Sequence, residues 1–282
     1  MISIITPTYN REVLVQTTIK SIQDQTFTDW ELIIVDDGST DNTEQILKPY
    51  LQDSRINYVK KENSGQAHSL NVGVSHAKGE FIVFLDSDDE AYPNWLQTVS
   101  DNLKDDTGIL CVGAIRKFPD GTTIEEDMNV FRLFGKVWKL KFTCGSLFIR
   151  RNIFNAIGGY DAGLKANIQT DLGYRLLSHL RNTNLKPVVL HEYLMQINAH
   201  DGERIRNNWK KRKEGSVQFI NKHYRFIREN DPKEIANIYS SIAFSSYKLK
   251  ERAESVRYLI KAIKHNPVRW VNYVRIFKYG LM

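Results

Sequence analysis

Residues 81–89 decide the fold, and they read Phe81-Ile82-Val83-Phe84-Leu85-Asp86-Ser87-Asp88-Asp89. An unbroken apolar run of this length is typical of a strand that is buried on both faces of a sheet. Two carboxylates separated by one residue at the end of such a strand lie about 6 to 7 Å apart on one side of an extended chain. Their hard oxygen atoms suit Mg²⁺ or Mn²⁺, so Asp86 and Asp88 are candidate site residues.

The same acids also have a structural interpretation, because aspartate is common at the amino terminus of a helix. A helix that begins near Pro93-Asn94-Trp95 would need one such cap, and Asp89 is the acid best placed to provide it. One acid is enough for a cap, so capping does not account for Asp86 and Asp88 together. We therefore expect Asp89 to be structural and the other two acids to belong to a site.

The alternation of apolar runs and helical stretches repeats towards the amino terminus. Strands are predicted at residues 2–5, 32–35 and 56–59, and helices at about residues 12–25, 40–47 and 66–77. Strands spaced in this way form βαβ units, which predict an α/β protein with a mostly parallel sheet and helices on both faces. Function gathers at the carboxyl ends of such strands, so the polar residues 6–10, 36–37 and 86–89 should meet there.

Composition excludes several classes of protein. The 282 residues are 41% hydrophobic and 26% charged, which excludes a disordered or collagen-like chain. No stretch approaches the roughly 18 to 20 uncharged apolar residues that span a bilayer. Met1 leads into a short apolar run without the basic and long apolar regions of a secretory signal. We therefore expect a cytoplasmic protein, in which Cys111 and Cys144 are reduced core residues.

Charge is divided unevenly along the chain. Residues 1–203 contain 20 Lys or Arg and 27 Asp or Glu, a net charge of −7, whereas residues 204–282 contain 19 and 6, a net charge of +13. Clustered acids hold a divalent cation or cap helices, and a basic region binds nucleic acid, anionic lipid or polyphosphate, or merely presents solvated helix faces. The basic region contains no recognised nucleic-acid-binding motif, so we do not expect nucleic acid as a partner.

Four segments in order resemble the signatures of the inverting family 2 glycosyltransferases of GT-A fold. They are residues 4–11 (IITPTYNR), 21–27 (SIQDQTF), 30–41 (WELIIVDDGSTD) and 84–89 (FLDSDD). The resemblance continues through residues 144–151, 158–161 and 170–176, and it covers about residues 1–204. It implies a Rossmann-like catalytic domain that transfers a sugar with inversion from a nucleotide sugar, a UDP-sugar being the expected donor. It also implies a Mn²⁺ or Mg²⁺ cofactor.

Residue by residue, the resemblance implies five roles in donor and metal binding. Pro7 and Tyr9 border the nucleotide base, and Asp37 hydrogen-bonds the base edge. Asp86 faces the ribose, and Asp88 binds the metal. A cation there agrees with the physics, because an acidic pocket would otherwise repel a nucleoside diphosphate. For Tyr9 alone, ordinary packing at the end of a strand is the competing interpretation.

The catalytic base is where the sequence departs from the family. An inverting transfer needs a carboxylate that removes the proton from the acceptor hydroxyl. The family often has Glu-Asp at this point, then another acid and an arginine, whereas this chain has Ile168-Gln169 followed by Asp171 and Arg175. Asp171 is the surviving carboxylate and therefore our candidate base. The alternative is a structural pair between Asp171 and Arg175, one helical turn later.

A histidine near the end of the matched region is a second candidate metal ligand. Residues 197–204 read INAHDGER and resemble the family segment that carries a histidine after the last catalytic strand. A neutral His200 imidazole beside Asp88 would complete a mixed nitrogen and oxygen shell suited to Mn²⁺. The alternative is that His200 is a surface loop residue.

Residues 205–282 are expected to form a separate, basic helical region. Residues 235–267 resemble one tetratricopeptide-type (TPR-like) helical hairpin, and a single repeat must pack on the catalytic domain or on a partner, a second copy in a homodimer included. Residues 270–279 mix aromatic, aliphatic and basic side chains, as a helix lying on a membrane does. We therefore expect peripheral contact with an anionic membrane. By analogy, the acceptor would be a growing glycan or a lipid-linked oligosaccharide in surface polysaccharide assembly.

Two other functions stay open on the sequence alone. The missing acidic pair is compatible with a nucleotide-sugar-binding protein that has no transferase activity. A sugar nucleotidyltransferase is disfavoured, because no glycine-rich, lysine-bearing phosphate loop follows the first strand.

Overall fold

The computed structural model describes residues 1–199 and 208–281, which form two compact units. The first unit contains residues 1–129, 139–162 and 169–199. The second contains residues 130–138, residues 163–168 and the helices from residue 208 onward. Two short segments that precede residue 204 therefore belong with the carboxyl-terminal helices.

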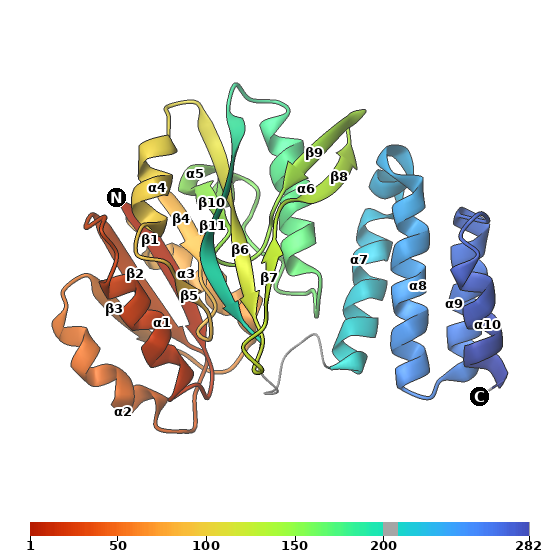
Figure 1. Cartoon of the computed structure of the whole chain (residues 1–282), viewed down its shortest axis with the longest axis horizontal. Coiled ribbons are helices and arrows are strands. Elements are labelled where there is room, and N and C mark those ends of the chain that lie inside the picture. The colour runs from red at the N-terminus through yellow and green to blue at the C-terminus, as the bar shows by residue number, and fades with distance from the viewer. Residues whose placement is uncertain (200–207, 282) are drawn as a thin grey trace. The chain divides into compact units, whose positions relative to one another are not determined.

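One large sheet with helices on both faces forms the first unit (Figure 1). Its strands are β1 (Ile2–Thr8), β2 (Trp30–Asp36), β3 (Ile56–Lys60), β4 (Phe81–Phe84), β5 (Glu90–Ala91), β6 (Thr107–Lys117), β7 (Thr123–Glu126), β10 (Leu147–Arg150) and β11 (Lys186–Asn198). Its helices are α1 (Leu14–Gln23), α2 (Thr43–Leu47), α3 (Gln66–His76), α4 (Trp95–Asn102), α5 (Arg151–Ala156) and α6 (Ile168–Leu180), with a 3₁₀ helix at Lys48–Gln52. The α/β architecture predicted from the sequence is confirmed.

The strand order explains where the site forms. Within the described residues the order is β3-β2-β1-β4-β10-β6-β11-β5, with β7 beside β6. Strands β3, β2, β1 and β4 run parallel to one another, and β11 runs parallel to β6. Strand β10 is antiparallel to both of its neighbours, β4 and β6. The carboxyl ends of β2, β1 and β4 therefore lie side by side, next to the amino end of β10.

Alternate residues of β1 pack on opposite faces of the sheet. Ile4 belongs to a core cluster with Ile19 of α1 and Trp95 of α4. Ile5 points to the other face, where α3 crosses so closely that a Cβ on Gly73 would overlap the Ile5 side chain. Both faces of the central strands are thus covered by helices, which is why these strands are apolar almost throughout.

The second unit contains a β-hairpin and four helices among its described residues. They are β8 (Asn129–Leu133), β9 (Lys136–Leu140), α7 (Trp209–Asn230), α8 (Pro232–Lys248), α9 (Arg252–His265) and α10 (Val271–Leu281). Phe134 at the hairpin turn donates its backbone N–H to Asn230 Oδ1 at 2.6 Å, and its ring meets the Phe226 ring edge-on. Helices α8 and α9 form a helical hairpin (Figure 1). Across residues 1–199 and 208–281, none of the helices is both long enough and apolar enough to cross a membrane.

Candidate functional site

The polar residues that follow β1, β2 and β4 meet at one edge of the sheet. Thr8 at the end of β1 lies opposite Asp36 at the end of β2, and the Asp37 N–H donates to the Thr8 carbonyl at 2.8 Å. On the other side of β1, the Leu85 N–H donates to the Ile5 carbonyl at 2.9 Å. The register of the sheet thus holds residues 6–10, 36–37 and 86–89 together, as the sequence predicts.

Residues 86–89 form an acidic turn, not the extended segment expected from the sequence. The Asp89 N–H donates to the Asp86 carbonyl at 3.1 Å, which closes the turn. Oxygen atoms of Asp86, Asp88 and Asp89 consequently lie within 4.8 Å of one another. Three carboxylates this close repel one another unless a cation lies between them, and an oxygen set of this kind fits Mg²⁺ or Mn²⁺.

Asp89 is structural, but the prediction that it caps a helix is wrong. Asn94 occupies the cap position of α4. The buried Asp89 carboxylate accepts the backbone N–H of Asn198 at 3.0 Å, and Asn198 Nδ2 donates to the Asp88 carbonyl at 2.9 Å. These bonds tie the acidic turn to the end of β11, so Asp89 positions the turn as well as adding charge to it.

Asp37 lies at the predicted edge, and both of its oxygens are engaged. Oδ1 accepts from the Lys61 ammonium and from the Ser64 N–H, and Oδ2 accepts from the Gly65 N–H at 2.9 Å. Burial alone would raise the pKa of this carboxyl, but the lysine and the two amides outweigh burial and hold the pKa below its ordinary value. Asp37 is therefore ionised at neutral pH and anchors residues 61–65 beside the site.

Pro7 lies near the end of β1, and Tyr9 directly follows the strand. Their contact with a nucleotide base stays a prediction. Pro7 lies opposite Val35 of β2, within the sheet. Tyr9 follows the strand and is 46% exposed, so its ring is not packed into the core. Asn10 next to it has a positive φ of 51°, and its N–H donates to Ser39 Oγ at 3.0 Å. The loops after β1 and β2 thus hold each other and leave the Tyr9 ring accessible.

A chain of contacts links the acidic turn to Gln169, which stands where the sequence resemblance leads one to expect an acid. Gln66 Nε2 donates to Asp86 Oδ1 at 3.0 Å. Cys144 also lies beside Asp86, and the pKa of the Cys144 thiol is raised well above its usual value, mainly by burial and then by the Asp86 charge. Gln169 Nε2 donates to Cys144 Sγ at 3.1 Å, and the Tyr160 hydroxyl donates to Gln169 Oε1 at 2.8 Å. Cys144 and Tyr160 were not predicted as site residues, although both lie in segments that resemble the family.

Asp171 forms a buried ion pair with Arg175, as the structural interpretation of this residue predicts. The side chain has an exposed fraction of 0%, and its Oδ2 accepts from Arg175 Nε at 2.9 Å and Nη2 at 2.6 Å. Arg175 Nη1 also donates to the carbonyls of Ile157 and Gly159. The role of Asp171 as a base stays a prediction, because the carboxylate is in contact with an arginine and not with solvent. His200, the predicted second metal ligand, lies outside the described residues.

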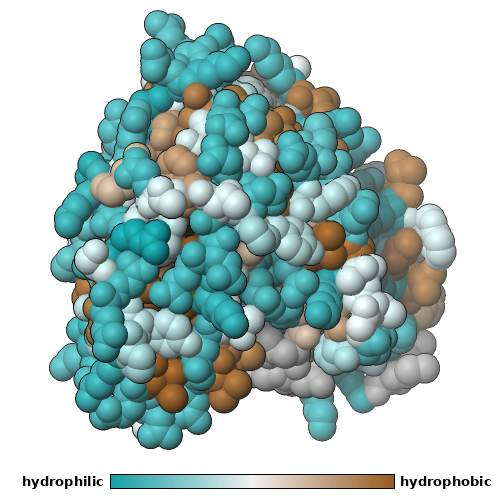
Figure 2. Space-filling view, turned by 60° about the vertical axis from the view of Figure 1, so that its left-hand side comes forward, coloured by the Kyte–Doolittle hydropathy of each residue, from teal (hydrophilic) through white to brown (hydrophobic). Residues whose placement is uncertain are grey.

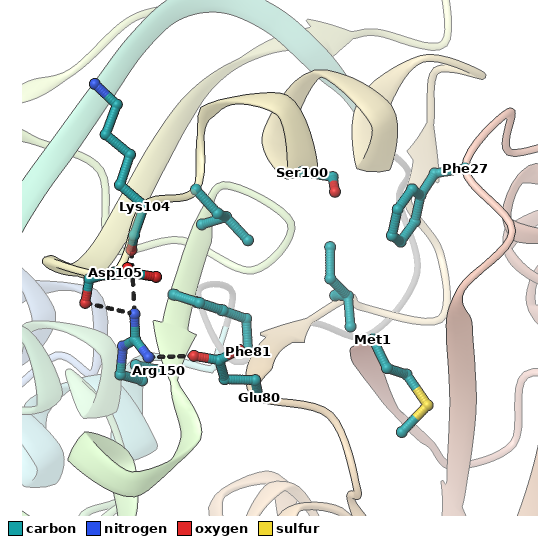
Figure 3. Close-up of a pocket in the computed structure, with 10 residues that line it drawn as sticks. Met1, Phe27, Glu80, Phe81, Ser100, Lys104, Asp105 and Arg150 are labelled. Carbon is teal, nitrogen blue, oxygen red and sulfur yellow. Dashed lines mark hydrogen bonds and ion pairs between the residues drawn. The ribbon is translucent and has the colours of Figure 1, made fainter.

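A cavity of about 200 Å³ lies at the amino ends of β1 and β4, at the opposite edge of the sheet (Figure 3). Its lining includes Met1, Phe27, Phe81 and Arg150. Arg150 Nη2 donates to the carbonyls of Lys104 at 3.2 Å and Asp105 at 3.0 Å, and Nη1 pairs with Glu80. The guanidinium is thus part of the cavity wall. This hollow is separate from the acidic turn.

Comparisons with known proteins agree with this geometry. The family model described as glycosyl transferase family 2 matches residues 3–168. The GalNAc(5)-diNAcBac-PP-undecaprenol β-1,3-glucosyltransferase of Campylobacter jejuni is 43% identical over 101 residues, 35% of this chain and 33% of its own length. Glycosyltransferase GlyG of Streptococcus pneumoniae is 36% identical over 115 residues, 40% of this chain and 38% of its own length. Each match thus spans less than two fifths of the relative's own length.

Solved structures show the same fold. Staphylococcus aureus TarS 1–349 in complex with UDP-GlcNAc superposes with a TM-score of 0.65 at 19% identity, over 99% of this chain and 89% of that one. The mannosyltransferase PcManGT of Pyrobaculum calidifontis, in complex with GDP-Man and Mn²⁺, superposes with a TM-score of 0.59 at 13% identity, over 99% and 84% of the two chains. The fold is that of the GT-A glycosyltransferases. With a family match over more than half of its length, this chain belongs to glycosyl transferase family 2.

Proposed function

We propose that this family 2 glycosyltransferase is metal-dependent and inverting, and that it transfers a sugar from a UDP-sugar to a hydroxyl of a glycan in surface polysaccharide biosynthesis. The observation that carries the proposal is the acidic turn, which presents three carboxylates within 4.8 Å at the edge of the sheet where ligands of such folds bind. Pro7, Tyr9 and Asp37 lie at the ends of the two neighbouring strands.

A nucleotide sugar fits this edge by its chemistry. The exposed Tyr9 ring offers a surface for a base to stack on, and Pro7 lies two residues before it. We propose that Asp37 hydrogen-bonds the edge of the base and that Asp86 faces the ribose. The solved TarS complex contains UDP-GlcNAc, which supports a UDP-sugar as donor.

A divalent cation fits the acidic turn. Asp88 is the proposed metal ligand, and Asp86 and Asp89 add negative charge beside it. The bound cation would neutralise charge on the departing nucleoside diphosphate. PcManGT was solved with Mn²⁺, which favours Mn²⁺ or Mg²⁺ here. His200 is proposed as a further ligand from the sequence alone.

The chain has no acid at the position where the family often carries the general base. Gln169 occupies the position of the usual acid and cannot take a proton, so we keep Asp171 as the candidate base. In the ion pair with Arg175, the buried Asp171 carboxylate cannot reach an acceptor hydroxyl. Acceptor binding has to open a path to the Asp171 carboxylate and loosen the hold of Arg175 before a proton can be accepted.

A nucleotide-sugar-binding protein without transferase activity is the second candidate function. One observation favours it: the family position of the base carries an amide, and the nearest surviving carboxylate is buried against an arginine. Such a protein would bind the donor in a metal-dependent way and release no nucleoside diphosphate.

The test is a donor screen scored by nucleoside diphosphate release, with UDP-sugars and GDP-sugars, in Mn²⁺, in Mg²⁺ and in a chelator. We expect release from a UDP-sugar that requires a metal. An Asp88→Ala variant should lose it, whereas Asp101→Ala, which removes an exposed carboxylate on α4, should keep it. Metal-dependent binding without release for every donor and acceptor would favour the binding protein. Release of pyrophosphate would instead indicate a nucleotidyltransferase.

The acceptor is proposed to be a lipid-linked oligosaccharide at an anionic membrane. The Campylobacter jejuni relative is named after an undecaprenol-linked glycan. Residues 204–282 of this chain carry a net charge of +13, which would attract an anionic membrane. Transfer of labelled sugar into an organic-extractable product, with and without an undecaprenyl-linked acceptor, tests this part separately from donor cleavage. Transfer only to free oligosaccharides would contradict it.

A further inference from the structure

Helix α10 has an inner face that fixes its rotation about its own axis. Asn272 is buried, and its Oδ1 accepts from Ser240 Oγ of α8 at 3.0 Å. Arg275 Nη1 also donates to Ser240 Oγ, at 2.6 Å. One turn further on, the buried Tyr279 ring stacks on the Tyr247 ring of α8, with centroids 4.2 Å apart. Two buried contacts along the helix therefore determine which side of α10 faces outward.

The outward side of α10 is apolar. Trp270, just before the helix, is 70% exposed, and Phe277 is 67% exposed. Tyr273 and Val274 are exposed as well, so the four residues follow the spacing of a single helix face. Single exposed apolar residues are common, but a continuous stripe that contains three aromatic rings indicates an interaction surface. Figure 2 shows one face of the molecule, on which hydrophobic residues form several small groups within a largely hydrophilic surface.

The stripe belongs to a basic stretch of the sequence. Residues 252–282 contain seven lysine or arginine residues and one glutamate, a net charge of +6. Lys264 near the end of α9 and Lys278 on α10 are both exposed. Aromatic rings insert at the headgroup level of a bilayer, and lysine or arginine side chains bind its phosphate groups. A second copy of the chain fits less well, because apposed α10 faces would bring two regions of like charge together.

We propose that the stripe formed by Trp270, Tyr273, Val274 and Phe277 is a docking surface for an anionic lipid bilayer. With 11 residues, α10 is too short to span a bilayer, so it lies in the plane of the interface. The basic side chains draw the second unit to the surface, and the aromatic rings then insert. The proposal concerns the second unit alone and does not depend on the donor chemistry proposed for the first.

Vesicle co-sedimentation of the full chain tests the proposal, with phosphatidylcholine vesicles that contain or lack phosphatidylglycerol, at low and high salt. The native chain should bind the anionic vesicles at low salt and lose binding as salt rises. The double variant Trp270→Ser/Phe277→Ser should bind at least about tenfold more weakly. The matched control Val13→Ser/Val137→Ser removes two similarly exposed apolar side chains elsewhere and should bind as the native chain does.

The controls separate the alternatives. Circular dichroism should show equal helix content in all variants, because the four changed side chains are exposed. Donor cleavage in solution should be unchanged in the double variant, so failure of the membrane proposal and failure of the proposed function are distinguishable. The proposal is overturned if the native chain does not sediment with anionic vesicles, or if the double variant binds them equally. A native dimer that becomes monomeric in the double variant, with no lipid binding, would assign the face to a second copy.

Discussion

Replacing Asp171 with alanine should cost stability because it leaves a cation without its partner. The carboxylate is completely buried and accepts two bonds from Arg175, at 2.6 and 2.9 Å. Removing one member of a buried ion pair typically costs 3–5 kcal/mol. The Arg175 side chain is 22% exposed and keeps its bonds to two backbone carbonyls, so water and the backbone compensate in part. We therefore expect a loss of about 3 kcal/mol for Asp171→Ala, at the lower end of that range.

The Asp171→Asn variant should lose less, about 1–2 kcal/mol, since the amide oxygen can still accept a hydrogen bond from Arg175. For a unit of this size, 3 kcal/mol corresponds to a fall in Tm of roughly 6–12 °C. A matched control is Glu229→Ala, which removes the acid of an exposed pair with Arg225 at the same four-residue spacing on α7. That change should alter the free energy of unfolding by less than about 0.5 kcal/mol.

Urea unfolding followed by circular dichroism measures all three variants, and nucleoside diphosphate release measures turnover below the lowered Tm. A purely structural Asp171 predicts that Asp171→Asn keeps turnover once the protein is folded. A catalytic base predicts a fall of about 10²- to 10⁴-fold in turnover, with donor affinity unchanged. A stability loss below about 0.5 kcal/mol for Asp171→Ala would refute the energetic reasoning. If Gln169→Ala damages turnover more than Asp171→Asn, the catalytic group lies elsewhere.

Three further predictions concern the metal, the pH and the thiols. Asp88→Ala should abolish the manganese-dependent part of UDP affinity with the fold intact, and an unchanged calorimetric titration would contradict the metal assignment. The pKa of Asp53 is lowered to about 2, mainly by its hydrogen bond to Arg55. The stabilisation by the ionised Asp53 carboxylate is therefore fully present above its ordinary pKa near 4 and is lost as pH falls through about 2. Asp53→Asn should cost at most about 1 kcal/mol at neutral pH and much less at pH 2, by urea unfolding, and a cost that does not change with pH would contradict this reasoning. Burial raises the pKa of the Cys111 thiol to about 12 and that of Cys144 well above its usual value. Ellman's reagent should thus react with neither in the native protein and with both in denaturant, whereas rapid native labelling would contradict their burial.

The amino-terminal part of the fold could be predicted from the sequence because its contacts are local. Residues 2–60 form successive βαβ units, in which β1 pairs with β2 and β2 pairs with β3, each only one connecting segment away. Strand β4 instead pairs with β1, across three helices. The antiparallel insertion of β10 was not predicted. Phe148 pairs with Val83 on one side and with Leu110 on the other, and such distant pairings leave no periodic signal in a single sequence.

The site was predictable in part for a related reason. Because acids follow an apolar strand in the sequence, Asp86 and Asp88 could be predicted to lie at the edge of the sheet, and they lie there in the structure. The turn that brings Asp89 into the cluster depends on Asn198, more than 100 residues further on. Likewise, a four-residue spacing allows a pair between Asp171 and Arg175, but burial is decided by the segments packed around α6. Sequence motifs therefore identify the chemical groups of the site better than their partners.

The antiparallel strand β10 also sets an order of assembly. Its pairing with β4 forms one flank of the acidic turn, and Cys144, just before β10, lies beside Asp86. During synthesis, the strands up to residue 85 can pair with one another before residue 144 has left the ribosome. Until then β4 is an open apolar edge, the kind of surface that recruits strands from other chains. We therefore expect fragments that end between β4 and β10 to aggregate, and fragments that reach past Arg150 to be the first that protect this edge.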